Sequence, residues 1–333
     1  MPVTVAINGF GRIGRSVLRA LVEQDRRDIE IVAINDLGPV ESLAHLLRHD
    51  SVHGRFPGTV ATGPDSLDVG RGPIRVSAQR DPARLDWRGV DIVMECTGIF
   101  KSRDKAALHL QNGAKRVLVS APAEGADKTI VYGINHDLLG EGDRIVSNAS
   151  CTTNCLVPVV KVLDEAVGIE RAFMSTVHSY TGDQPTLDTL HADPYRGRAA
   201  AMSMVPTSTG AAKALTQVLP GMKGRIDGVA VRVPTPNVSL VDLTFDAARP
   251  TSAEEINEVI RAAAEGPMQG ILGVTEEKLV SIDLNHDPRS SVFSTDQTRV
   301  TDGTLCRILT WYDNEWAFSN RMLDTAAQMA KFL

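Results

Sequence analysis

The first half of the chain alternates short apolar runs with segments of helical periodicity. Residues 3–8 (VTVAIN) form an apolar run, and residues 12–24 carry apolar side chains at helical spacing. Further strand-like runs lie at residues 29–35, 90–96, 115–121 and 129–134. Such alternation is typical of a parallel sheet covered on both faces. We therefore predict an α/β fold with a Rossmann-type doubly wound parallel sheet over residues 1–150.

The second half has a different pattern. Strand-like runs follow one another with few helical segments between them, at residues 228–233, 237–245, 278–284 and 306–313. This succession predicts an α+β domain with a mostly antiparallel sheet over residues 151–314. A last helix is predicted over residues 315–333, which carry apolar side chains at Trp316, Phe318, Met322 and Met329.

Length and composition limit the class of protein. The 333 residues suffice for two domains, and 43% hydrophobic with 23% charged residues describe a globular chain with a sizeable core. The net charge of −6 argues against nucleic-acid and anionic-membrane partners. The first apolar run is too short for a signal peptide or a membrane span. Four cysteines are too few for a disulfide scaffold, so we expect free thiols and a cytoplasmic location.

A glycine motif follows the first predicted strand. Gly9, Gly11 and Gly14 give the G-x-G-x-x-G spacing between a strand and a helix, the arrangement that binds a dinucleotide pyrophosphate at a helix N-terminus. Asp36 ends the next strand, where a carboxylate accepts hydrogen bonds from ribose hydroxyls and repels a 2′-phosphate. The pattern predicts NAD as the cofactor. The alternative is a structural turn with a solvated Asp36.

Two cysteines stand three residues apart in SNASCTTNC, residues 147–155. A helix beginning near Ser150 places Cys151 in its first turn, where the N–H groups favour a thiolate, and places Cys155 one turn deeper among apolar neighbours. Pro158 argues for a kink or a later start of that helix. A disulfide is disfavoured by the expected compartment, and a zinc site by the lack of a second ligand pair nearby. We expect Cys151 to be the reactive thiol.

Histidines offer two candidate sites. His178 ends the apolar run 173–177, so its ring is either a catalytic base for the thiol or a structural histidine. His45, His49 and His53 have the i, i+4, i+8 spacing of a metal-binding helix face. The helix is expected to end before His53 and no carboxylate pair completes a ligand set, so we predict packing histidines there and no metal.

Six segments in order resemble the phosphorylating glyceraldehyde-3-phosphate dehydrogenase family: INGFGRIGR, SNASCTTNC, HSYTGDQ, PTSTGAAKA, RVPTPNVSLVDL and WYDNEW. The resemblance runs the length of the chain. It implies a homotetramer, a Rossmann domain, a catalytic domain and a final helix, residues 315–333, that returns to the Rossmann domain. It also implies oxidation of glyceraldehyde 3-phosphate with NAD and inorganic phosphate through a cysteine thioester.

The resemblance also implies residue roles. Cys151 matches the nucleophile and His178 its base. The residues that match the site of the substrate's C3 phosphate are Thr181, Asp183 and Arg232. Those that match the site of inorganic phosphate are Ser150, Thr152, Arg198, Thr209 and Gly210. Those that match cofactor contacts, beyond the three glycines, are Arg12 and Ile13 at the pyrophosphate, Asp36 at the adenosine ribose, Arg80, Thr97 and Ser120 near the adenine and linker, and Asn314 at the nicotinamide amide.

The sequence is compatible with two rival functions. Erythrose-4-phosphate dehydrogenase shares the glycine motif and SCTTNC, but that group typically departs from YTGDQ and TSTGAAKA, both present here. A regulatory dinucleotide-binding protein without catalysis is the rival from another class. The intact Cys151, His178 and arginines argue against it.

Overall fold

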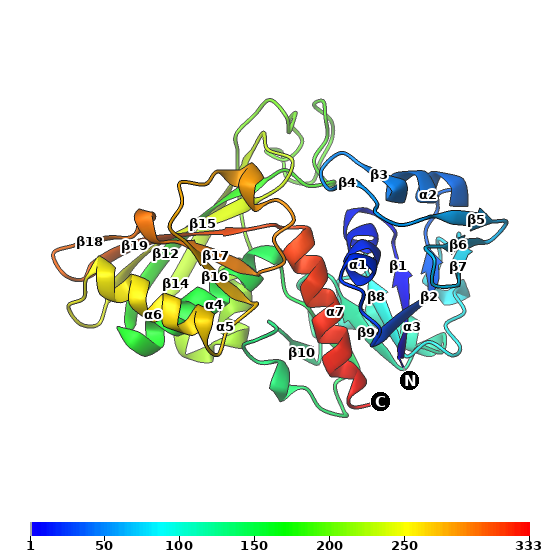
Figure 1. Cartoon of the computed structure of the whole chain (residues 1–333), viewed down its shortest axis with the longest axis horizontal. Coiled ribbons are helices and arrows are strands. Elements are labelled where there is room, and N and C mark those ends of the chain that lie inside the picture. The colour runs from blue at the N-terminus through cyan, green and yellow to red at the C-terminus, as the bar shows by residue number, and fades with distance from the viewer. Residues whose placement is uncertain (1) are drawn as a thin grey trace. The chain divides into compact units, whose positions relative to one another are not determined.

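A computed structural model describes residues 2–333 and contains two compact units (Figure 1). Unit 1 comprises the chain up to Ala149 together with Ser319–Leu333, and unit 2 comprises Ser150–Phe318. Across the described residues, no helix has both the length and the apolar character needed to cross a membrane.

Unit 1 is built on a nine-stranded sheet with strand order β10-β11-β9-β8-β1-β2-β7-β6-β5. The strands from β10 to β7 in that order pair in parallel, whereas β5 and β6 are antiparallel additions at one edge. The elements of unit 1 are β1 (Val3–Asn8), α1 (Arg12–Glu23), β2 (Ile29–Asn35), α2 (Val40–Arg48), β3 (His49–Asp50), β4 (Gly54–Arg55), β5 (Ala61–Gly63), β6 (Ser66–Asp68), β7 (Pro73–Ser77), β8 (Ile92–Glu95), α3 (Arg103–Gln111), β9 (Arg116–Val119), β10 (Lys128–Thr129), β11 (Ile145–Ser147) and the larger part of α7 (Trp316–Ala330).

The strand order of unit 1 indicates where a ligand crevice is expected. The chain moves from β1 through α1 to β2 in one direction, and from β8 through α3 to β9 in the other. Right-handed crossovers then put α1 and α3 on opposite faces of the sheet. Every residue of β8 and β9 is buried, as expected for strands covered on both faces. The reversal between β1 and β8 is the point where doubly wound sheets bind ligands.

One predicted strand of unit 1 is wrong. Residues 129–134 pair only through the two-residue β10, and the neighbouring strand is β11, which the sequence analysis did not identify. The side chain of Asn135 accepts a hydrogen bond from Val131 N and donates one to Thr129 O, and this closes the segment into a turn. Ile130 and Val131 are buried in a turn because local side-chain hydrogen bonds replace a strand partner.

Unit 2 is built on an eight-stranded sheet. The strand order is β13-β14-β12-β15-β19-β17-β16, with β18 paired to β19. The pairs β12–β14 and β16–β17 are parallel and the others antiparallel. The elements are α4 (Cys151–Ala166), β12 (Ile169–Ser179), β13 (Val205–Thr207), α5 (Ala211–Val218), β14 (Ile226–Val233), β15 (Ser239–Ala247), α6 (Ala253–Glu265), β16 (Leu272–Thr275), β17 (Ser291–Ser294), β18 (Arg299–Thr301) and β19 (Leu305–Tyr312).

Helices α4, α5 and α6 pack against the sheet of unit 2 (Figure 1). Two features of this unit differ from the prediction. Residues 278–284 do not form a strand, because the Asp283 side chain accepts a hydrogen bond from Val280 N and closes a short 3-10 turn over Ser281–Leu284. Helix α6, capped by Ser252, lies in a region where the sequence indicated few helices.

Candidate active site and cofactor cavity

Cys151 is the first residue of α4. Ala149 adopts a left-handed conformation (φ 56°), and the chain then enters the helix at Ser150, whose hydroxyl caps the helix by accepting a hydrogen bond from Thr153 N at 3.1 Å. The predicted start near Ser150 is therefore confirmed. Pro158 lies inside the helix, which continues to Ala166, so the proline does not delay its start.

His178 lies near the end of β12, with its Nε2 3.5 Å from the Cys151 Sγ. Its Nδ1 is 2.6 Å from the carbonyl oxygen of Ser179. A carbonyl only accepts, so Nδ1 carries the proton and Nε2 presents a lone pair to the thiol. The edge-to-face contact with Tyr312, 5.8 Å between ring centroids, supports the imidazole. The structure thus brings the two predicted catalytic residues together with the tautomer that a base requires.

Burial controls the ionisation of this pair. Burial and, to a lesser extent, the nearby Arg232 charge lower the pKa of His178 to about 3. Burial also raises the pKa of the Cys151 thiol, against the opposing effects of the Arg232 charge and of hydrogen bonds from Thr152. The sequence-based expectation of an ionised thiol is wrong for this structure, since desolvation outweighs the helix N-terminus. Both shifts favour the neutral forms, a thiol at Cys151 and an imidazole at His178.

The other thiols are in different surroundings. All four cysteines are free. Cys155 is fully buried beside Ser291, and burial raises its pKa to about 12, in agreement with the bystander role expected for it. Among the described residues, no group of three or more His, Cys, Asp or Glu side chains could hold a metal ion. The His45 and His49 rings contact each other with centroids 5.0 Å apart.

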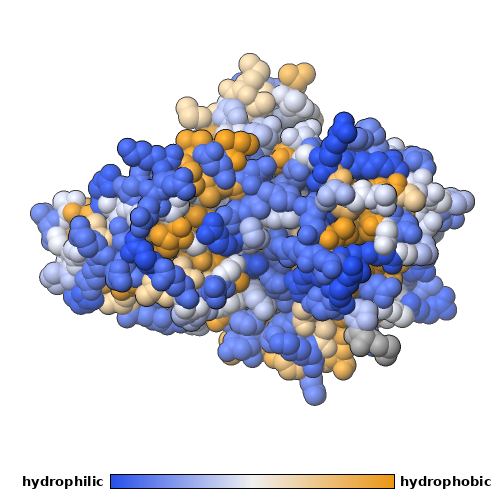
Figure 2. All heavy atoms as spheres, in the orientation of Figure 1, coloured by the Kyte–Doolittle hydropathy of each residue, from blue (hydrophilic) through white to orange (hydrophobic). Residues whose placement is uncertain are grey.

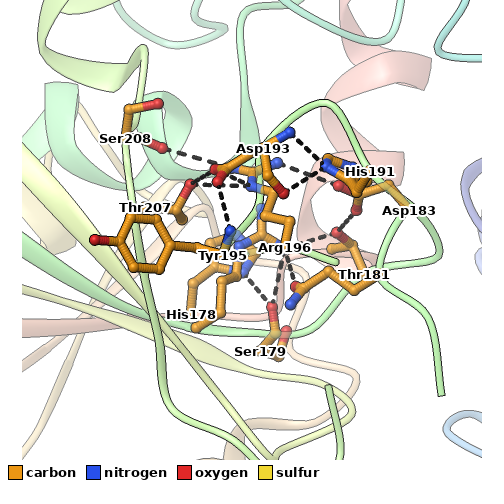
Figure 3. A network of polar contacts seen from close by, with 12 residues as sticks. His178, Ser179, Thr181, Asp183, His191, Asp193, Tyr195, Arg196, Thr207 and Ser208 are labelled. Atoms are coloured by element: carbon orange, nitrogen blue, oxygen red, sulfur yellow. Dashed lines mark hydrogen bonds and ion pairs between the residues drawn. The ribbon is translucent and has the colours of Figure 1, made fainter. Parts of the chain in front are cut away.

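An anion-binding cluster adjoins His178. Parallel pairing of β12 with β14 sets Arg232 directly beside His178. Arg232 Nη1 donates to the Thr181 hydroxyl at 2.6 Å, and that hydroxyl donates to the Asp183 carboxylate. Figure 3 shows His178, Thr181 and Asp183 close together in this network. The predicted residues of the C3 phosphate site therefore lie together.

Arg196 joins this cluster and Arg198 does not. Arg196 donates to Asp183 at 3.1 Å and to the Thr207 hydroxyl at 3.1 Å (Figure 3). The Arg198 side chain, 66% exposed, pairs instead with Asp188. The sequence offered R-x-R at residues 196–198 without a periodic element to show which arginine faces the site. The structure places Arg196, and not Arg198, beside the residues predicted for the C3 phosphate, and it leaves Arg198 away from the residues predicted for inorganic phosphate.

The remaining residues predicted for inorganic phosphate occupy different positions. Ser150 caps α4, and Thr209 and Gly210 stand at the N-terminus of α5, where the Thr209 hydroxyl accepts a hydrogen bond from Ala211 N. The Thr152 side chain is buried, and its hydroxyl bonds to the Tyr312 hydroxyl at 2.8 Å. Only the backbone of Thr152 is therefore suited to an anion in this arrangement.

The side chain of Asn314 is held by two serines. Its Oδ1 accepts hydrogen bonds from the hydroxyls of Ser179 at 2.8 Å and Ser239 at 2.9 Å. With both bonds on the oxygen, the amide group keeps one orientation and the NH₂ remains a donor. This orientation suits a residue that binds the carboxamide of a nicotinamide ring.

Unit 1 contains a cavity of about 300 Å³ at the carboxyl ends of β1, β2 and β8. Five of the predicted cofactor residues line it: Gly9, Gly11, Asp36, Arg80 and Thr97. Gly9 has φ 92°, and a Cβ there would lie 2.8 Å from Thr97 N. A Cβ on Gly11 would meet nothing within 4 Å, so backbone borders open space at that point. This cradle fits a dinucleotide.

The other predicted cofactor residues surround the same turn. Asp36 accepts hydrogen bonds from Phe10 N at 2.7 Å and Gly38 N at 3.1 Å, which fix its carboxylate at the cavity wall. Arg12 and Ile13 begin α1, where Arg12 pairs with Asp50 at 2.5 Å. Ser120 follows β9 and bonds to Cys96, which lines the cavity.

A buried network that the sequence analysis missed supports this cavity. Glu95 is 1% exposed, and its carboxylate accepts hydrogen bonds from Asn8 at 2.6 Å and from Thr97 N at 2.8 Å. His109 Nε2 lies 2.9 Å from the same carboxylate, and Trp87 donates to His109 Nδ1 at 3.0 Å. An acidic residue inside the apolar run 90–96 was the available signal. The network fixes Asn8 and Thr97, both of which line the cavity.

Comparison with known proteins agrees with this geometry. Residues 3–103 match the NAD binding domain of glyceraldehyde 3-phosphate dehydrogenase, and residues 150–314 match the C-terminal domain of the same family. The chain is 68% identical to glyceraldehyde-3-phosphate dehydrogenase of Cereibacter sphaeroides over 100% of both chains. It is 67% identical to that of Xanthobacter flavus and 52% identical to that of Geobacillus stearothermophilus, each over 99% of both chains.

Proposed function

The chain belongs to the glyceraldehyde-3-phosphate dehydrogenase family, NAD-dependent oxidoreductases that act on an aldehyde group, and on that premise we propose how its residues work. We propose that it oxidises D-glyceraldehyde 3-phosphate with inorganic phosphate to 1,3-bisphosphoglycerate, through a thioester on Cys151. The observation that carries this proposal is the 3.5 Å contact between the Cys151 thiol and the unprotonated Nε2 of His178.

The first step joins the thiol to the aldehyde. His178 Nε2 accepts the thiol proton as Sγ attacks the aldehyde carbon, because both groups start neutral and within reach. The imidazolium returns that proton to the aldehyde oxygen, which gives a hemithioacetal. Backbone N–H groups at the start of α4 and the imidazolium N–H stabilise the negative charge that develops on that oxygen.

The second step oxidises the carbon. His178 Nε2 removes the hydroxyl proton, and the hemithioacetal becomes a thioester on Cys151. Bound NAD supplies the acceptor for the hydride that leaves the carbon. When NAD binds, Gly9, Gly11 and Asp36 would hold its pyrophosphate and ribose in the unit 1 cavity, and the Asn314 amide would donate to the nicotinamide carboxamide.

The third step transfers the acyl group to inorganic phosphate. A phosphate oxygen attacks the thioester carbon, the carbon–sulfur bond breaks, and the Cys151 thiolate regains a proton from His178. Ser150 and the N-terminus of α5 at Thr209 and Gly210 bind the attacking anion. Arg232, Arg196 and Thr181 bind the C3 phosphate of the substrate.

The test is NADH formation from glyceraldehyde 3-phosphate while inorganic phosphate is varied. Turnover is expected to rise with phosphate and saturate. Cys151→Ser is expected to abolish phosphate-dependent NADH formation, because a neutral hydroxyl is a far weaker nucleophile than the thiol. Cys155→Ala is the matched control and is expected to affect packing but not the chemistry, because Cys155 is fully buried. Near-normal turnover by Cys151→Ser would rule the scheme out.

Erythrose-4-phosphate dehydrogenase is not favoured as the activity. The relatives compared above are named glyceraldehyde-3-phosphate dehydrogenase, and Thr181, Thr209 and Gly210 stand in the segments in which the other group departs. Steady-state rates with the two aldehydes, each with and without phosphate, distinguish the activities. A higher kcat/KM for erythrose 4-phosphate would contradict the proposal.

We also propose a cytoplasmic homotetramer. Three apolar side chains, Phe173, Val229 and Leu305, are 42% to 50% exposed on strands of the unit 2 sheet. The strand register puts them on one face, while α4, α5 and α6 pack against the sheet. A second copy that covers this face would remove their apolar area from water.

A further inference from the structure

Two donors beside His178 stand out because they are buried and unpaired. Arg232 Nε and Gln184 Nε2 have no hydrogen-bond partner within residues 2–333. The two side chains contact each other, because Arg232 Nη1 donates to Gln184 Oε1 at 3.2 Å. A buried donor left without an acceptor is unfavourable, and proteins usually satisfy such a group with a ligand or water. The pair therefore indicates a position where an acceptor binds.

The orientation of the Gln184 amide follows from its neighbour. A guanidinium only donates, so the atom of Gln184 that faces Arg232 is the oxygen, and the NH₂ lies on the other side. The backbone holds this arrangement, because Gln184 N donates to the Thr181 carbonyl at 2.9 Å and closes a turn. Thr181 is in turn bonded to Arg232 at 2.6 Å.

We propose that Gln184 is a further residue of the phosphate-binding pocket. Its Oε1 positions the Arg232 guanidinium, and its Nε2 donates to the phosphoryl group of the aldehyde substrate. This assignment rests on the proposed function. It deepens that function by adding to the anion site a side chain that none of the sequence motifs had assigned.

The chemistry of the ligand explains why a neutral amide is useful there. A phosphoryl dianion presents three acceptor oxygens and needs several directional donors. Asp183 accepts from Arg196 and so partly neutralises the charge of the pocket. An amide adds a donor without a further charge, and it holds Arg232 without competing for the phosphoryl group as a carboxylate would.

The decisive comparison uses two aldehydes and two variants. Gln184→Met removes both polar atoms at similar volume, and Gln184→Glu keeps an acceptor for Arg232 but replaces the donor with a negative charge. We expect Gln184→Met to raise the KM for glyceraldehyde 3-phosphate at least fivefold with kcat within about twofold. Gln184→Glu should raise it further. The kcat/KM for unphosphorylated glyceraldehyde should fall several-fold less than that for glyceraldehyde 3-phosphate, since that substrate has no phosphoryl group.

Gln111→Met is the control, because Gln111 is exposed at the end of α3 in unit 1. Equal losses with both aldehydes, or an unchanged KM in both Gln184 variants, would overturn the assignment. A second measurement does not need turnover. Inorganic phosphate is expected to raise the thermal unfolding midpoint of the wild type more than that of Gln184→Met. If the wild type does not oxidise glyceraldehyde 3-phosphate, the proposed function fails, while this binding difference still decides the role of Gln184.

Discussion

At the scale of single residues, Arg232 is the charge that both members of the reactive pair feel. It favours the thiolate of Cys151 and disfavours the imidazolium of His178, while burial acts against every charged form. The consequence is a base that is free to accept a proton at neutral pH and a thiol that still holds one. Reactivity then depends on proton transfer within the pair.

Alkylation by the neutral reagent iodoacetamide tests this balance. Cys151 should react ahead of Cys155, yet its rate should keep rising above pH 8.5, because burial raises the thiol pKa. Arg232→Met removes the opposing charge, so at a fixed pH the rate should fall about tenfold for each unit by which the thiol pKa rises. Arg198→Met is the charge-matched control. A rate that levels off near pH 6 would show that the resting thiol is already ionised.

The two arginines of the loop at 196–198 give a second test. Arg196→Met should lower kcat/KM for glyceraldehyde 3-phosphate by 10- to 100-fold, on the order of 1.4–2.7 kcal/mol, since it removes a guanidinium from the anion cluster. Arg198→Met should cost less than twofold, because its partner Asp188 is also exposed. Steady-state kinetics of the two variants decide the assignment. The reverse order would show that Arg198, and not Arg196, contributes to substrate binding.

The sequence predicted residues well where a motif fixed their surroundings. Cys151 follows a capping serine, and Asp36 directly follows β2 beside a glycine turn, so each position follows from local geometry, while the roles stay predictions. Arg196, Gln184 and Glu95 could not be identified in this way. Their positions depend on strand pairing and on loop contacts far apart in sequence, as when β13 brings Thr207 to Arg196.

At the scale of elements, two glycines in the turn and helix that follow β1 have different effects. Gly14 allows close packing, whereas Gly11 leaves space at the cofactor cavity. A Cβ on Gly14 would lie 2.2 Å from the Gly9 carbonyl oxygen, so the helix packs against the turn only because that atom is absent. A Cβ on Gly11 would lie in open space at the cavity. The same substitution at the two positions should therefore have different effects.

Gly14→Ala should destabilise unit 1 by about 1–3 kcal/mol through overpacking, and it should weaken NAD binding as a consequence. Gly11→Ala should leave the unfolding midpoint within about 2 °C, yet weaken NAD binding at least tenfold because the methyl group occupies the pyrophosphate position. Thermal unfolding and equilibrium titration with NAD measure the two effects. Equal changes in stability would mean that the turn has no packing role distinct from binding.

Strands were predicted correctly where the apolar run in the sequence is also buried between neighbouring strands. The strands at 3–8 and 29–35 match β1 and β2 because apolar runs there pair with neighbours on both sides. The runs at 129–134 and 278–284 are equally apolar, but Asn135 and Asp283 bond to the local backbone and close turns. Side-chain competition for backbone groups is a local effect that hydrophobic periodicity does not report.

At the scale of the whole molecule, the visible surface is mainly hydrophilic, with apolar groups scattered across it (Figure 2). Within unit 2, the face that carries Phe173, Val229 and Leu305 is open to solvent along strands β12, β14 and β19. A net charge of −6 makes copies of the chain repel one another, so their association needs a favourable contact that outweighs this repulsion. Covering this apolar face with a second copy would supply such a contact, because it removes the three side chains from water.

The double variant Phe173→Glu, Val229→Glu tests this arrangement. A two-fold interface contains each residue twice, so the double variant adds two carboxylates from each chain to it. These carboxylates oppose association because they repel one another and would lose their hydration. Sedimentation of the wild type should give four times the chain mass, and the double variant should give a smaller species with an unchanged helix and strand content. Leu138→Glu, an equally drastic change at an exposed leucine of unit 1, should leave the assembly intact. Tetramers in the double variant would mean that this sheet face is not where the copies meet.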